Sequence, residues 1–111
     1  MPRIANYKID AQIRQLNEFE NYNGTITAIR FSTDNGTIYS ITHWSTRILA
    51  YNLDTHKIEF LALGKISQTT STLVGRILRN LPPVAVFDLL NAPDLSKPEQ
   101  KRLAKMARLI P

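Results

Sequence analysis

The sequence predicts an α+β fold: an antiparallel β-meander of four to five strands followed by three C-terminal helices. Apolar and β-branched residues alternate between turn signals over residues 24–63, which is typical of strands. Apolar residues recur at helical spacing behind capping signals over residues 71–110. We expect one domain over residues 1–111, with the sheet in 24–63 and a basic helical half in 71–110.

The N-terminal segment contains apolar residues at helical spacing, which predicts a short amphipathic helix over residues 9–20. An irregular strand is the alternative for this segment. Within the meander, Asn35-Gly36 predicts a hairpin with a type I′ turn, because that turn needs a positive φ at both central residues. Ser45-Thr46 marks a turn, bulge or bend, and a second turn over residues 53–56 leads into a strand over residues 57–63.

Three helices are predicted after the sheet, which Gly64 is expected to end, over residues 72–81, 84–90 and 97–110. Ser71 or Thr70 is the expected N-cap of the first, since a hydroxyl there accepts from an unpaired amide of the first turn. The last begins with Ser96-Lys97-Pro98-Glu99, which has the spacing of a capping box.

The net charge of +5 comes from the second half of the chain. Residues 1–63 hold six bases and six acids, whereas residues 64–111 hold eight bases and three acids. On the predicted last helix, four bases share one face and four apolar residues the other: Lys97, Lys101, Lys105 and Arg108 against Leu103, Met106, Ala107 and Ile110. This asymmetry favours an anionic partner, with a merely solvated basic face as the competing interpretation.

The leading hypothesis is a non-enzymatic protein that binds nucleic acid or another anionic partner, such as an acidic protein surface. The candidate contacts are the bases of the helical half: Arg76, Arg79, Lys97, Lys101, Arg102, Lys105 and Arg108. The three helices are also compatible with a helix-turn-helix arrangement, whose phosphate contacts would be salt-sensitive and weakly sequence-specific. A second subunit on the apolar side of the last helix, giving a homo-oligomer, is equally compatible.

Two alternative functions come from other classes. One is a protein-interaction module that inhibits a host enzyme or defence complex through its basic surface. The other is a small-ligand site where hydroxyl side chains and a helix N-terminus meet at the sheet–helix junction, since such sites hold anions well. Its candidate residues are Trp44, Arg47, Thr69, Thr70 and Ser71. The competing interpretation is that these residues are strand formers and caps.

No motif for catalysis, metal or cofactor binding stands out, and none is predicted. The chain has no cysteine, and its two histidines lack clustered carboxylates. The nine aromatic residues concentrate in the sheet half; we expect them to pack in the core, because no strand carries the Gly/aromatic/basic motif of RNA-stacking sheets. No apolar run approaches the roughly 18 residues of a membrane span, and no signal peptide is visible, so a cytoplasmic protein without a membrane partner is expected.

Two short segments resemble a pairing found in small phage-encoded proteins that have no assigned activity. The matching residues are Trp44, Thr46, Ile48, Ala50 and Tyr51 on a strand, then Ser67, Thr69, Thr70 and Ser71 before a helix. Those proteins often have Lys-His next, where this chain has Thr72-Leu73. The resemblance implies a phage or mobile-element origin and action in the host cytoplasm, and it implies no catalytic role.

Overall fold

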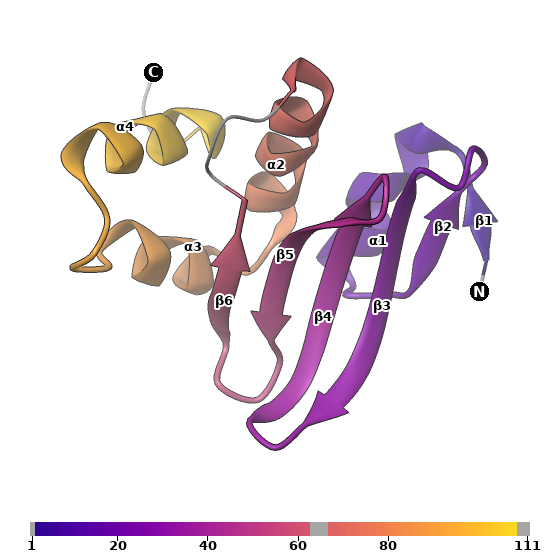
Figure 1. Ribbon diagram of the computed structural model, residues 1–111, viewed down its shortest axis with the longest axis horizontal. Helices are drawn as coiled ribbons and strands as arrows, with labels where there is room; N and C mark the ends of the chain where they lie inside the picture. The colour runs from indigo at the N-terminus through magenta and orange to yellow at the C-terminus, as the bar shows by residue number, and fades with distance from the viewer. Residues whose placement is uncertain (1, 63–66, 109–111) are drawn as a thin grey trace.

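The computed structural model describes residues 2–62 and 67–108, and the fold in these residues is α+β (Figure 1). Within them, six strands lie across one sheet in sequence order: β1 (Arg3–Ile4), β2 (Phe19–Asn21), β3 (Ile26–Thr33), β4 (Gly36–His43), β5 (Thr46–Asn52) and β6 (Lys57–Leu61). β1 is parallel to β2, and the other neighbours are antiparallel. The helical elements are η1 (Asn6–Lys8), α1 (Ile9–Arg14), α2 (Gln68–Asn80), α3 (Pro83–Leu90) and α4 (Lys97–Met106).

The helix predicted over residues 9–20 is correct only as far as Arg14. Leu16 has φ 57° and turns the chain out of the helix. Phe19 then enters β2, where it pairs with Ala28 and is fully buried. The sheet therefore begins before residue 24, because a tertiary contact of Phe19 with the sheet outweighs its helical spacing.

The β3–β4 hairpin is confirmed, but its turn differs from the predicted one. Thr33 pairs with Gly36, so Asp34 and Asn35 are the central residues, and of the expected pair only Gly36 has a positive φ, 129°. The side chain of Asn52 fixes this arrangement: its Nδ2 donates to the Asn35 carbonyl and its Oδ1 accepts from two amides of the β5–β6 turn.

The β4–β5 hairpin turns one residue earlier than predicted. His43 pairs with Thr46, which makes Trp44 and Ser45 the two central residues. Their φ values are 53° and 66°, so this turn, and not the Asn-Gly one, has the two positive φ angles of a type I′ turn. The Trp44 amide donates to the Thr25 carbonyl at 2.8 Å, which joins this turn to the start of β3.

The core lies between one face of the sheet and the helices. Strand residues that are opposite one another in register, such as Ala28, Ile41 and Leu49, all belong to it. The helices contribute Ile13, Val74 and other apolar residues to the same cluster. Figure 1 shows the β2–β3 turn, the β4–β5 turn and the start of α2 at one end of the sheet, with the β3–β4 and β5–β6 turns at the other.

The helices follow the prediction with shifted ends. The N-cap of α2 is Ser67, whose Oγ accepts from the Thr70 amide, so the helix starts before the predicted caps Thr70 and Ser71. The capping box of α4 forms as predicted between Ser96 and Glu99. α4 ends at Met106, and the predicted sheet end at Gly64 and the helix end at Ile110 lie outside the described residues.

Candidate functional site

The outer face of α4 carries three lysines; we call it the lysine face and define it as Lys97, Lys101 and Lys105. These lysines are spaced four residues apart, so they follow one another along one side of the helix, and all three are exposed. The opposite side of α4 is fixed by Leu103 and Ala107, both buried in the core of the chain. The helix therefore packs on α2 and α3 and presents the lysines outward.

None of the lysines of this face has an acidic partner in the described part of the chain. The ion pairs found there join Arg3 to Glu20 and Arg76 to Asp10. The nearest acid in sequence, Glu99, accepts from the Ser96 hydroxyl in the capping box. Within residues 2–62 and 67–108, no ion pair compensates the charge of the lysine face.

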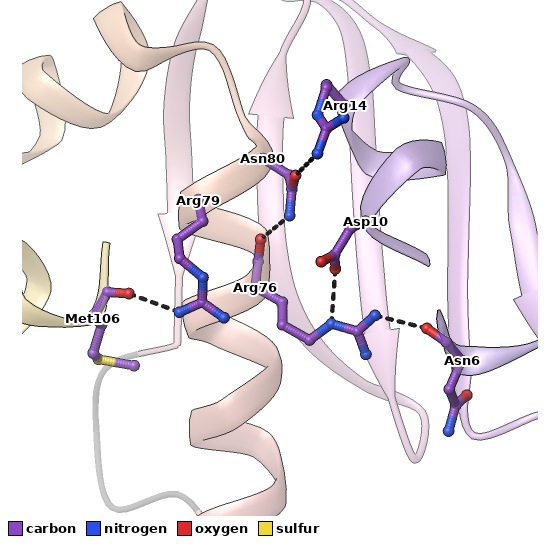
Figure 2. A network of polar contacts seen from close by, with 7 residues as sticks. All are labelled: Asn6, Asp10, Arg14, Arg76, Arg79, Asn80 and Met106. Atoms are coloured by element: carbon purple, nitrogen blue, oxygen red, sulfur yellow. Dashed lines mark hydrogen bonds and ion pairs between the residues drawn. The ribbon is translucent and has the colours of Figure 1, made fainter. Parts of the chain in front are cut away.

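The predicted contacts Arg76 and Arg79 have structural roles, which Figure 2 shows. Arg76 Nε lies 2.8 Å from Asp10 Oδ1, and its Nη2 donates to the Asn6 carbonyl at 2.6 Å. Arg79 points to the other side of α2 and donates to the Met106 carbonyl at the C-terminus of α4. The two guanidinium groups therefore tie α2 to the N-terminal segment and to α4, respectively.

Positive charge gathers where α2 meets the end of α4. Burial lowers the pKa of Arg79, and the charges of Arg108 and Arg76 lower it further, with Asp10 acting in the opposite direction. Arg108 is exposed and lies beyond the helix, with φ 58°, so it does not continue the lysine face as predicted. Arg102 is exposed beside the lysine face on α4.

The sheet–helix junction brings together some of the residues predicted for a small-ligand site. The Thr70 hydroxyl hydrogen-bonds His43 Nδ1 at 2.9 Å and accepts from Ser67 Oγ. Beside this contact lies an open pocket of about 280 Å³ lined by Asn6, Ile26, His43, Gln68, Thr69, Thr72, Leu73 and Arg76. Of the five predicted residues only Thr69 lines it; Thr70 contacts the lining residue His43, and Trp44, Arg47 and Ser71 lie outside the lining.

The prediction that the aromatic residues pack in the core is wrong for several of them. Phe19, Tyr39 and Tyr51 are buried as expected, with the pKa of both tyrosines raised by burial. The aromatic residues that are substantially exposed instead are Tyr7, Tyr22, Trp44, Phe60 and Phe87. The sequence did not indicate the exposure of Trp44, because its turn has no Asn or Gly to mark it.

The described residues contain no group of three or more acidic or histidine side chains arranged to hold a metal ion. Among the helices in those residues, none has the length and apolarity to cross a membrane. No protein-family model, curated protein or solved structure matches the chain.

Proposed function

We propose that this chain is a non-enzymatic nucleic-acid-binding protein that contacts phosphates through the lysine face of α4. The observation that carries the proposal is the uncompensated row of Lys97, Lys101 and Lys105 on a helix whose other side is buried. Lysine side chains on such a row can follow the regularly spaced phosphates of a polyanion, and each contact releases a condensed counterion.

The stability of α4 does not account for the row as a whole, although Lys105 lies in the last turn, where a positive charge interacts favourably with the helix dipole. Like charges four residues apart destabilise a helix by about 0.2–0.5 kcal/mol per pair. α4 is held instead by its capping box and by the burial of Leu103, which is 1% exposed. An anionic partner would offset the repulsion between Lys101 and Lys105. Binding therefore explains the lysine row better than folding does.

An acidic protein surface would meet the same three lysines and is the second candidate. The small-ligand alternative has weaker support, because the one base lining the junction pocket, Arg76, is already paired with Asp10. A host-defence target or a phage origin would be compatible with either macromolecular partner, and neither is needed for the proposal.

The proposal is tested by measuring the affinity of a labelled oligonucleotide at about 50 mM salt, where phosphate contacts are strong. We expect the double variant Lys101→Glu/Lys105→Glu to bind at least tenfold more weakly than the unchanged chain, because two phosphate contacts become repulsive.

The matched control is Arg30→Glu/Lys57→Glu, which changes the net charge by the same amount at exposed positions on β3 and β6. It should lose much less affinity than the α4 variant. Equal losses in the two variants would mean that only net charge matters and would contradict the assignment to α4. The absence of binding by the unchanged chain, with capture of an acidic protein instead, would favour the second candidate.

A further inference from the structure

A second exposed surface lies at the end of the sheet where the β2–β3 and β4–β5 turns meet. We call it the aromatic edge and define it as Tyr7, Tyr22 and Trp44. Their exposed fractions are 80%, 63% and 72%, so the protein presents most of each ring to solvent. Burying a large aromatic side chain would stabilise the fold, and three rings left outside at one end therefore point to a contact with a partner.

The three rings come from segments that one buried side chain holds together. Asn21, 1% exposed, donates from Nδ2 to Asn6 Oδ1 and to Thr25 Oγ1, and its Oδ1 accepts from the Ile26 amide. Asn6 precedes Tyr7, and Tyr22 follows Asn21 directly. The Thr25 carbonyl accepts from the Trp44 amide. The backbone positions of the aromatic edge are thus fixed relative to one another.

Trp44 is held in an unfavourable backbone conformation. Trp44 and Ser45 both have positive φ, which costs roughly 1–2 kcal/mol for each residue with a side chain. The ring recovers little of this by packing, since it is 72% exposed and its ring contact is a tilted one with His43 at 6.2 Å between centroids. Asn-Gly would form the same turn with less strain, so the presence of tryptophan is best explained by a role outside folding.

The charges around the aromatic edge favour an anionic partner. The Lys8 ammonium lies 5.8 Å from the centroid of the Tyr7 ring, and Arg47 is exposed three residues after Trp44. The acids of this region are paired, Glu20 with Arg3 and Asp10 with Arg76. Exposed rings beside uncompensated bases are the combination that single-stranded nucleic acids use, with bases stacking on the rings and phosphates near the cations.

We propose that the aromatic edge stacks unpaired bases, so that the ligand of this protein is a single-stranded nucleic acid or a single-stranded region. This inference deepens the proposed function and rests on it. Figure 1 shows α4 at the same end of the molecule as the β2–β3 and β4–β5 turns, on the far side of α2, so the elements that carry the two surfaces lie at one end. A duplex keeps its bases stacked inside and would contact the lysine face alone.

The test compares a single strand of about 12 nucleotides with a duplex of equal length, using the fluorescence of Trp44. Because Trp44 is the sole tryptophan, its emission reports on this site directly. We expect the single strand to quench the emission and the duplex to leave it nearly unchanged. We expect Trp44→Asn and Tyr22→Ala each to weaken single-strand binding by about 5- to 100-fold, measured by anisotropy of a labelled strand.

Two control variants separate stacking at the aromatic edge from effects on the turn and from the loss of any exposed ring. Ser45→Gly relaxes the same turn and keeps Trp44, and Phe87→Ala removes an exposed ring on α3, outside the aromatic edge, so both should bind as the unchanged chain does. Equal affinity for duplex and single strand, without quenching and without effect of the aromatic variants, would overturn this inference and leave the proposed function standing. Failure of both nucleic acids to bind at low salt would overturn the proposed function, and this inference with it.

Discussion

The two ends of the sheet are constructed alike but present different side chains. At each end a buried asparagine joins two chain segments: Asn21 at the aromatic edge, and Asn52 at the end where the β3–β4 and β5–β6 turns lie. The Asn52 end exposes small polar residues such as Asp34, Asn35 and Asp54. The aromatic edge exposes rings instead.

The backbone shows the same contrast. At the Asn52 end the residue with φ 129° is Gly36, and a Cβ there would lie 2.7 Å from Asp54 Oδ2, so glycine satisfies both the angle and the space. At the aromatic edge Gly24 has φ 71°, but positive φ also falls on two adjacent residues with side chains, Trp44 and Ser45, whereas the Asn52 end has one such residue, His56 with φ 59°. The aromatic edge therefore has two adjacent strained residues against one at the Asn52 end, and one of the two is an exposed tryptophan, as is common at binding sites.

The largest effect is expected at the Asn52 end. Replacing Asn52 by alanine removes hydrogen bonds to the Asn35 carbonyl, to Glu59 and from the amides of Asp54 and Thr55. We expect Asn52→Ala to lower the free energy of unfolding by about 2–4 kcal/mol in urea titrations. The exposed control Asn35→Ala should cost well under 1 kcal/mol, since its carbonyl is retained. If Asn52→Ala lowered the free energy of unfolding by less than about 1 kcal/mol, the two turns would not depend on this side chain.

The opposite sign is expected at the aromatic edge. Asn tolerates positive φ better than Trp, so Trp44→Asn should raise the free energy of unfolding by about 1 kcal/mol while it weakens single-strand binding. The measurement is the same urea titration. A destabilised Trp44→Asn variant would mean that the ring supports the fold, and that the aromatic edge gives up no stability to hold it.

The buried tyrosines, unlike the exposed rings of the aromatic edge, should make the free energy of unfolding depend on pH. Tyr39 donates from its hydroxyl to the Asn17 carbonyl at 2.8 Å, and burial raises its pKa despite the nearby charge of Arg30. An unfolded tyrosine loses its proton near pH 10, so above that pH the folded chain holds more protons than the unfolded chain. The free energy of unfolding therefore falls as pH rises, by up to about 1.4 kcal/mol per pH unit for this one group.

Replacing Tyr39 by phenylalanine removes this contribution. Urea midpoints measured on both sides of about pH 10 should fall less steeply with pH in Tyr39→Phe than in the unchanged chain. At neutral pH the variant should be less stable by about 1 kcal/mol, because the hydrogen bond to Asn17 is lost. Identical alkaline slopes would show that Tyr39 does not titrate late.

Much of the fold could be predicted from local patterns. Strand alternation, the hairpin near Asn35-Gly36 and the capping box at Ser96 depend on neighbouring residues, and each is present in the structure. The prediction was wrong for Phe19, which lies in β2 and not in a helix, and for the N-cap of α2, which is Ser67 and not Thr70 or Ser71. Neither the strand partner of Phe19 nor the first residue of α2 can be read from local spacing. The turn at Asn35-Gly36 likewise differs from the predicted type I′ turn, because the side chain of Asn52, seventeen residues beyond Asn35, donates to the Asn35 carbonyl.

The candidate site was predicted in part. The lysine face could be seen because helical periodicity places Lys97, Lys101 and Lys105 together whatever the tertiary structure. The engagement of Arg76 with Asp10 could not, since the two residues are 66 positions apart. The exposure of Trp44 could not either, because a tryptophan in a strand-like pattern is ordinarily buried and its positive φ depends on the register of β4 with β5.

The central claim, that the lysine face contacts phosphates, is tested most directly by the dependence of single-strand affinity on salt. For a single strand the logarithm of the affinity falls with the logarithm of salt concentration by about 0.7 for each phosphate contact. Loss of Lys101 and Lys105 as phosphate contacts should therefore make the slope shallower by about 1.4 in Lys101→Gln/Lys105→Gln, while Arg30→Gln/Lys57→Gln leaves it unchanged. An unchanged slope in the α4 variant would contradict the account, because it would show that α4 neutralises no phosphate.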